Sequence, residues 1–172
     1  EFLTREAPDL VVDFSAYTGV SKAEDQRGQK DGDCWQINVV GTKNMIDALP
    51  AETRLIYVST NYVFSGSEGN QGPYLENHKP EIDPDQLTWY GYAKAEAERI
   101  VGNRGVIARI SSPVRARFSP KADFLRNFLH LYDRGNLKSL FADQYISVSF
   151  IDEVCLALKI IIDKKELSGI FH

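Results

Sequence analysis

Short apolar runs alternate along the chain with longer amphipathic stretches. The runs Leu10–Phe14, Leu55–Val58 and Gly105–Ile110 are rich in branched apolar residues and are bounded by turn residues. Continuous apolar runs of this length are typical of parallel strands that are buried on both faces. We therefore predict three such strands.

Apolar residues recur at helical spacing between these runs. This pattern predicts helices over Cys34–Leu49, Tyr90–Val101, Lys121–Tyr132 and Ile151–Lys164, and a helix that ends near Glu6. A short strand is expected at Tyr145–Phe150, and another begins near Ser168. The polar segments Gly19–Asp33 and Ser65–Leu87 are expected to be loops, the first with one helical turn.

The alternation of strands and helices predicts an α/β fold with a mostly parallel sheet and helices on both faces. Ligands of such sheets bind at the carboxyl ends of the strands. The segments that follow the three strands are therefore the candidate site: Ser15, Ala16, Tyr17 and Thr18; Ser59, Thr60, Asn61 and Tyr62; Ser111, Ser112 and Pro113.

Composition and charge narrow the class of protein. The chain has 172 residues and a net charge of −4, whereas nucleic-acid binders normally present a basic face. No apolar run approaches the roughly 20 residues of a membrane span. Cys34 and Cys155 form no disulfide framework and no C-x-x-C motif, which favours reduced thiols in a cytoplasmic protein. The three histidines lack metal-ligand spacing.

One glycine cluster matches a dinucleotide-binding motif by letter only. Gly66, Gly69 and Gly72 have the G-x-x-G-x-x-G spacing. That motif must open a helix, whose N-terminus receives the pyrophosphate. Here Pro73 follows directly and Pro80 lies shortly beyond, so we expect a surface loop.

Tyr90 and Lys94 are candidates for acid–base chemistry. Their i, i+4 spacing places both side chains on one face of the predicted helix. An ammonium beside a phenol lowers the phenol's pKa, and such a pair can exchange a proton with a sugar oxygen. The alternative is an exposed helix start with a solvated lysine. Thr60, at the end of a buried strand, can hold a substrate oxygen against Tyr90 or merely cap its own strand.

Several segments together resemble the extended short-chain dehydrogenase/reductases, and within them the dTDP-4-dehydrorhamnose reductase group. They are Pro8–Thr18, Ile37–Asn44, Val58–Gly66, Pro73–Glu76, Trp89–Glu98 and Asp143–Gln144. They resemble, among others, the group's Ser-Thr-Asp-Tyr-Val-Phe, Pro-Tyr-x-Glu and Tyr-Gly-x-x-Lys runs. The resemblance covers nearly the whole chain in the right order.

This resemblance implies a Rossmann-like, doubly wound sheet that binds NAD(P)H and reduces a 4-keto nucleotide sugar. Residues 1–113 would be the nucleotide-binding core, and residues 114–172 part of a small substrate-binding region interleaved with it. Tyr90 would be the proton donor, Lys94 would bind the nicotinamide ribose, and Thr60 and Asn61 would contact the substrate. The cofactor-binding residues would be Ser15, Ala16, Tyr17, Thr18, Asn38, Val58, Ser59, Tyr90, Lys94, Ser111, Ser112 and Pro113. No metal is implied, and a homodimer is compatible with the group.

The chain also departs from the group's pattern. Asn61 stands in place of an aspartate, Asp13 and Phe14 replace an asparagine and a small residue, and Ser112 replaces a tryptophan. Val148-Ser149 stands where the group has Pro-Thr. The group's first βαβ unit, with its glycine-rich loop, is not in this sequence, so we expect a fragment or a degenerate paralogue that does not itself bind NAD(P)H.

Two alternatives remain open at this stage. A nucleotide-sugar 4-epimerase or 4,6-dehydratase is the close one, although Phe64 favours the reductase. The other is a non-catalytic regulatory subunit of the same fold, similar to the beta subunit of methionine adenosyltransferase, because fold and motif do not by themselves fix function.

Overall fold

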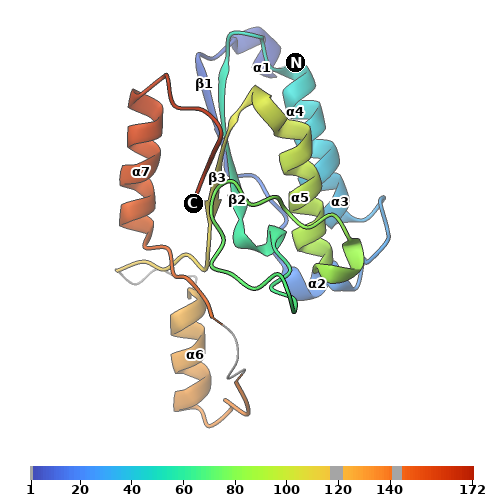
Figure 1. The fold of residues 1–172 in the computed structure, drawn as a ribbon, viewed down its shortest axis with the longest axis vertical. Helices are drawn as coiled ribbons and strands as arrows, with labels where there is room; N and C mark the ends of the chain where they lie inside the picture. The colour runs from blue at the N-terminus through green and yellow to red at the C-terminus, as the bar shows by residue number, and fades with distance from the viewer. Residues whose placement is uncertain (1, 117–121, 141–144) are drawn as a thin grey trace. The chain divides into compact units, whose positions relative to one another are not determined.

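A computed structural model describes residues 2–116, 122–140 and 145–172 of the chain (Figure 1). The chain divides into two compact units, which are described separately. The first comprises residues 1–109 and 167–172, and the second comprises residues 110–166. The final residues thus return to the first unit, whereas the sequence led us to place the boundary at residues 113 and 114.

The first unit is built on a four-stranded sheet with the order β1-β2-β3-β4 (Figure 1). The strands are β1 (Leu10–Asp13), β2 (Arg54–Thr60), β3 (Val106–Ile110) and β4 (Ile170–Phe171). β1 pairs with β2 in parallel, and β3 pairs with β4 in parallel. The three strands expected from the apolar runs are confirmed, as are the short final strand and the α/β class.

Helices α4 (Thr42–Ala48) and α5 (Trp89–Val101) lie side by side against the sheet (Figure 1). The other helices of this unit are α1 (Phe2–Glu6), α2 (Val20–Glu24) and α3 (Asp33–Trp35), and short 3₁₀ turns occupy Asn61–Val63, Pro84–Gln86 and Gly102–Arg104. One core cluster joins Leu55 and Tyr57 of β2 to Ala97 and Val101 of α5. Burial of the apolar face of α5 in this cluster holds the helix, which carries the candidates Tyr90 and Lys94, against the sheet.

The helix expected over Cys34–Leu49 is interrupted. Between α3 and α4, residues Gln36–Gly41 form a π-helical turn. The Asn38 carbonyl accepts a hydrogen bond of 2.7 Å from the Thr42 hydroxyl, which competes with the regular helical pattern. Such π turns occur frequently at functional sites.

The loop after the first 3₁₀ turn behaves as the sequence predicts for the glycine cluster. Gly66 and Gly69 have positive φ angles, and the Gly72–Pro73 peptide bond is cis. Turns follow, and the next helical residues are the 3₁₀ turn Pro84–Gln86. The cluster therefore does not open a helix, and the surface-loop interpretation is confirmed.

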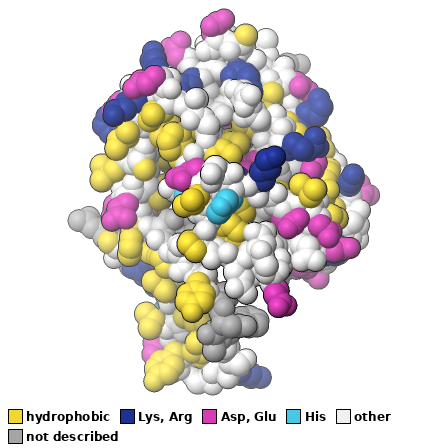
Figure 2. All heavy atoms as spheres, viewed as in Figure 1, with side chains coloured by type: hydrophobic (Ala, Val, Ile, Leu, Met, Phe, Trp, Pro, Cys, Tyr) yellow, Lys and Arg dark blue, Asp and Glu magenta, His cyan; other side chains and the backbone are white. Residues whose placement is uncertain are grey.

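The second unit contains α6 (Phe124–Asp133) and α7 (Ile151–Asp163). The strand expected at Tyr145–Phe150 is wrong: only a single bridge between Val114 and Phe150 forms. The segment around Val114 pairs with Phe150 alone, so the other residues of Tyr145–Phe150 have no neighbouring strand with which to form a sheet. Figure 2 shows hydrophobic side chains gathered on α6, where Phe124, Leu125, Leu129, Leu131 and Tyr132 are exposed.

In the part of the chain that the structure describes, every helix is too short or too polar to cross a bilayer.

Candidate active site at the carboxyl edge of the sheet

Tyr90 lies in the first turn of α5, close to the end of β2. The helix is capped by Thr88, whose hydroxyl accepts the backbone N–H of Gly91 at 3.0 Å. The 3₁₀ turn that follows Thr60 packs against α5, and the Tyr62 ring meets the Tyr90 ring edge-on with centroids 5.6 Å apart. This contact places the phenol beside the carboxyl edge of the sheet.

The Thr60 side chain lies beside Tyr90 and interacts with its phenol. Burial raises the pKa of Tyr90 to about 12, and the interaction with Thr60 offsets part of that rise. The structure therefore brings together the two hydroxyls that the sequence paired. At neutral pH the phenol is fully protonated, which is the form that a proton donor needs.

Lys94 does not lower the pKa of Tyr90 as the sequence led us to expect. Its ammonium donates to the Tyr57 hydroxyl at 2.5 Å and to the Val58 carbonyl at 3.0 Å, both on β2. Burial lowers the pKa of Lys94 to about 8, while the charges of Asp13 and Glu98 raise it. The expectation fails because desolvation of the phenol outweighs any charge effect, and because the ammonium is bonded to a different tyrosine.

Asn38 braces the loop that follows β1. Its side-chain oxygen accepts the backbone N–H of Tyr17 at 3.1 Å, and its amide nitrogen donates to the Tyr17 carbonyl at 3.2 Å. The same nitrogen lies 3.6 Å from the Cys34 sulfur. In this loop Ser15 donates its backbone N–H and its hydroxyl to Asp13, at 2.8 and 2.6 Å. The hydrogen bonds between Asn38 and Tyr17 and between Ser15 and Asp13 together fix the segment Ser15–Thr18 at the carboxyl end of β1.

Ser59 is turned toward the core. Its hydroxyl donates to Glu98 at 2.6 Å, and Glu98 also receives a two-point ion pair from Arg109 of β3. All three side chains are buried. Ser59 therefore ties β2 to α5 through its hydrogen bond to Glu98.

The first residues of the loop after Thr60 are held by a stack of side chains. The Phe64 ring lies parallel to the Tyr74 ring at 4.1 Å, and the Arg109 guanidinium lies 4.8 Å from the Phe64 centroid. Stacking of this kind stabilises the loop by about 1 kcal/mol per contact. The loop is thereby connected to the Glu98–Arg109 pair.

The remaining candidates lie in other surroundings. Ser111, Ser112 and Pro113 belong to the second unit, in which the Ser111 hydroxyl donates to the Ser147 carbonyl at 2.8 Å and Ser112 has a φ of +41°. Asn61 is exposed and lies 3.4 Å from Thr60 through its side-chain oxygen. Asp143 and Gln144 lie outside the described residues.

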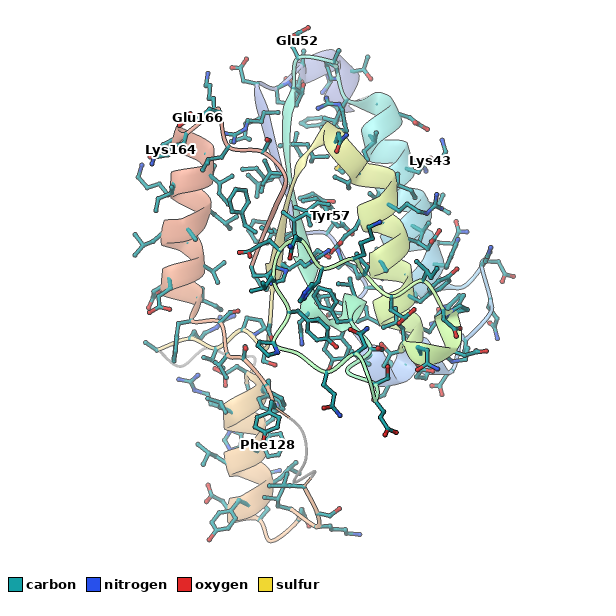
Figure 3. The ribbon with its side chains drawn as sticks, viewed as in Figure 1. Lys43, Glu52, Tyr57, Phe128, Lys164 and Glu166 are labelled. Atoms are coloured by element: carbon teal, nitrogen blue, oxygen red, sulfur yellow. The ribbon has the colours of Figure 1, made fainter. Side chains whose placement is uncertain are left out.

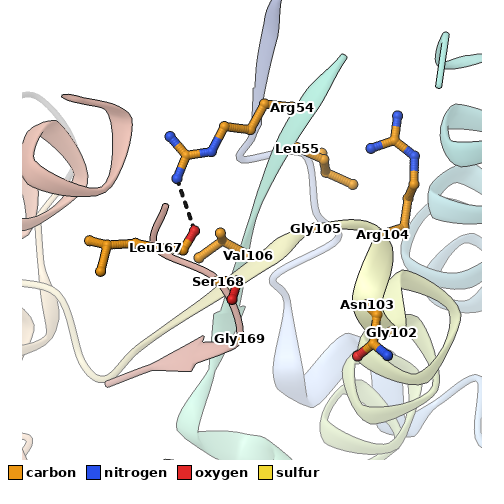
Figure 4. A pocket seen from close by; sticks show the side chains of 10 residues that line it. All are labelled: Arg54, Leu55, Gly102, Asn103, Arg104, Gly105, Val106, Leu167, Ser168 and Gly169. Carbon is orange, nitrogen blue, oxygen red and sulfur yellow. Dashed lines mark hydrogen bonds between the residues drawn. The ribbon is translucent and has the colours of Figure 1, made fainter. Parts of the chain in front are cut away.

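A hollow of about 390 Å³ opens at the opposite edge of the sheet, where β2, β3 and β4 begin (Figure 4). Arg54, Leu55 and Val106 line it, and Arg54 donates to the Leu167 carbonyl at 3.1 Å. The hollow lies at the amino-terminal edge of the sheet, away from Thr60, so it is separate from the candidate active site. The described residues contain no cluster of His, Cys, Asp and Glu suited to a metal ion.

The sequence analysis gave no role to four residues that contact the candidates or hold them in place: Asp13, Tyr57, Glu98 and Arg109. A signal for two of them exists in the spacing. Tyr57 and Ser59 lie two apart on β2 and share a face, and Glu98 continues the i, i+4 series of Tyr90 and Lys94. The identity of the helix that covers this strand face is a property of the tertiary fold.

Comparison with known proteins places the chain in one family of α/β proteins. The model of the RmlD substrate binding domain matches residues 1–172, so the chain belongs to that family. A dTDP-4-dehydrorhamnose reductase of Sinorhizobium fredii is 28% identical over 175 residues, which cover 96% of this chain and 55% of that protein. The chain thus spans about half the length of the curated relatives it matches.

Solved structures agree with this assignment. A dTDP-4-dehydrorhamnose reductase of Bacillus anthracis in complex with NADP is 25% identical, with a TM-score of 0.76 over 99% of this chain and 57% of that one. An orthologue from Clostridium acetobutylicum is also 25% identical, with a TM-score of 0.79 over the same shares.

Proposed function

We propose that this chain carries the catalytic groups of an NADPH-dependent reductase that converts a dTDP-linked 4-keto sugar to the alcohol. The observation that carries the proposal is the pairing of Thr60 with Tyr90 at the carboxyl edge of the sheet, with Lys94 one helical turn away. The named relatives are reductases of this kind.

In this proposal Tyr90 delivers the proton. Its raised pKa keeps the phenol protonated at neutral pH, so it can donate to the sugar oxygen as negative charge develops there. The Thr60 hydroxyl lies beside it and donates a hydrogen bond to the same oxygen, which orients the carbonyl and stabilises the developing charge. Asn61 is exposed at the end of the same strand and contacts the sugar.

The residues present fit a nicotinamide cofactor. Within the described residues Lys94 uses two of its three N–H donors, so one remains for a ribose hydroxyl. The braced loop from Ser15 to Thr18 lies at the adjoining strand end and would hold the cofactor there. When bound, the reduced nicotinamide supplies the hydride.

The test is an assay of the complete gene product with dTDP-4-keto-6-deoxy sugar and either NADPH or NADH. We expect substrate-dependent oxidation of the cofactor, with NADPH preferred, and formation of a dTDP-deoxyhexose that mass spectrometry detects as a gain of two hydrogens. Binding of NADPH with no turnover of any keto nucleotide sugar would contradict the proposal and favour a regulatory protein of the same fold. Conversion without net cofactor oxidation would favour an epimerase.

A further inference from the structure

Tyr57 is a completely buried tyrosine near the middle of β2, and the proposed reaction gives it no role. It lies between the sheet and helix α5 (Figure 3). Its hydroxyl accepts a hydrogen bond of 2.5 Å from Lys94, and the ammonium lies 4.0 Å from the centroid of its ring. Tyr57 is thus in direct contact with the charged group of the candidate site.

The contact continues through the helical layer. The Thr42 side chain interacts with the Tyr57 phenol, and the Thr42 hydroxyl donates to the Asn38 carbonyl at 2.7 Å. All four side chains are buried. The series Lys94, Tyr57, Thr42 and Asn38 therefore connects α5, β2 and the π turn entirely through protein atoms.

We propose that Tyr57 is a positioning residue for Lys94, whose ammonium it holds in the charged form with one N–H left for a ligand. The Tyr57 oxygen and the Val58 carbonyl occupy two of the three donors of the ammonium. Tetrahedral geometry at nitrogen then fixes the direction of the third. The consequence for catalysis rests on the function proposed above, whereas the effect on Lys94 itself does not.

The charges around Lys94 determine the direction of the effect. Asp13 faces it from β1 and Glu98 from its own helix, while Tyr57 on β2 and Thr42 and Asn38 in the helical layer contribute neutral groups. Burial raises the pKa of Tyr57, so this phenol remains a neutral acceptor over the working range of pH. Removing its oxygen leaves a buried ammonium with one acceptor, and the pKa of Lys94 must fall further.

The variant Tyr57→Phe removes the oxygen and keeps the ring. The matched control is Tyr92→Phe on α5, whose ring packs in the aromatic cluster with Trp35 and Trp89. Lys94 is titrated by NMR in protein labelled with ¹³C at the lysine ε-carbon, its signal being assigned by loss in Lys94→Arg. We expect its proton affinity to fall about tenfold in Tyr57→Phe and to be unchanged in Tyr92→Phe.

In the complete gene product, Tyr57→Phe is expected to move the alkaline limb of the pH–activity profile downward by about one unit. The KM for the cofactor is expected to rise several-fold, with kcat below pH 7 changed little. A Lys94 titration identical in wild type and Tyr57→Phe overturns the inference, even if activity falls. If Tyr57→Phe does not fold, Tyr57→Leu, which also lacks the oxygen, takes its place: a Lys94 titration that is unchanged in this variant overturns the inference.

The two proposals fail separately in this design. A Lys94 signal that responds to Tyr57→Phe in a protein that reduces no keto sugar contradicts the proposed function and supports the positioning of Lys94. Reductase activity with an unresponsive Lys94 supports the function and contradicts the role of Tyr57.

Discussion

The backbone carbonyl of Tyr62 lies directly against Gly91, so close that a Cβ at Gly91 would stand 2.2 Å from the carbonyl oxygen. The same position would bring that atom 3.1 Å from the Thr88 hydroxyl that caps α5. Only a residue without a side chain permits this approach of helix and turn. The approach sets the distance between Tyr90, which precedes Gly91, and the strand end that carries Thr60.

Gly91→Ala is therefore expected to destabilise the fold by about 1–3 kcal/mol, as overpacking usually does, and to lower kcat by separating Tyr90 from Thr60. Urea unfolding and steady-state kinetics measure the two effects. Gly41→Ala is the control, since a Cβ there meets only ordinary contact at 3.4 Å. Equal stability of Gly91→Ala and Gly41→Ala would contradict this prediction, because it would show that the turn containing Tyr62 moves away from the added methyl group at little cost in free energy.

Tyr90→Phe removes the proposed proton donor and keeps the ring against Tyr62. In the complete gene product, we expect kcat to fall about 10²–10⁴-fold with little change in cofactor affinity, because the phenol transfers its proton only in the chemical step. Fluorescence titration with NADPH and turnover assays measure both quantities. Tyr92→Phe serves as the control, and an unchanged kcat in Tyr90→Phe would refute the assignment.

Lys94 makes the stability of the chain depend on pH. Burial lowers its pKa to about 8, below the value of the unfolded chain, so the unfolded state binds the proton more tightly. The buried ammonium therefore lowers the free energy of unfolding by its full amount below pH 8. This loss of stability diminishes as the pH rises from 8 toward 10 and the folded protein releases the proton. The stabilisation that Lys94→Met confers relative to wild type should shrink by about 2 kcal/mol between pH 7 and pH 10.

Urea unfolding at both pH values measures this difference. Lys43→Met is the control, because Lys43 is exposed and pairs with Asp47 on the surface of α4. A stability difference for Lys94→Met that does not vary with pH would mean that the lysine is solvated in solution.

The buried pair of Glu98 and Arg109 gives a further prediction. Glu98→Ala leaves a buried guanidinium without its carboxylate and is expected to cost about 3–5 kcal/mol, whereas the double variant Glu98→Leu/Arg109→Met should recover much of that loss. The pair of the partly buried Glu96 and the exposed Arg99 is the control on the same helix, and Arg99→Ala should cost under about 1 kcal/mol. Similar losses for Glu98→Ala and Arg99→Ala in chemical denaturation would contradict the ion pair.

The strands and α5 could be predicted from sequence because each depends on local pattern. Leu10–Asp13 and Val106–Ile110 are short runs of mainly apolar residues, and the i, i+4 spacing of Tyr90 and Lys94 puts both on one face of a helix. The strand at Tyr145–Phe150 failed since β-propensity expresses itself only beside a partner strand. The orientation of Lys94 toward Tyr57 depends on which strand face α5 covers, and no local pattern encodes that choice.

The π turn was missed for a related reason. The apolar spacing from Cys34 to Leu49 is that of an ordinary helix, and the interruption arises where Thr42 and Asn38 bond to groups outside the regular pattern. Periodicity reports which residues face the core, not where a single extra residue is accommodated within a turn.

Asn38 gives the loop after β1 a partner that behaves like a neighbouring strand. Its amide accepts the N–H of Tyr17 and donates to the carbonyl of the same residue, as one peptide group does to another in a sheet. The loop therefore loses its conformational freedom when the chain folds, long before any nucleotide arrives. The segment Ser15–Thr18 is therefore preorganised. A ligand that binds to it does not lose free energy in ordering the loop.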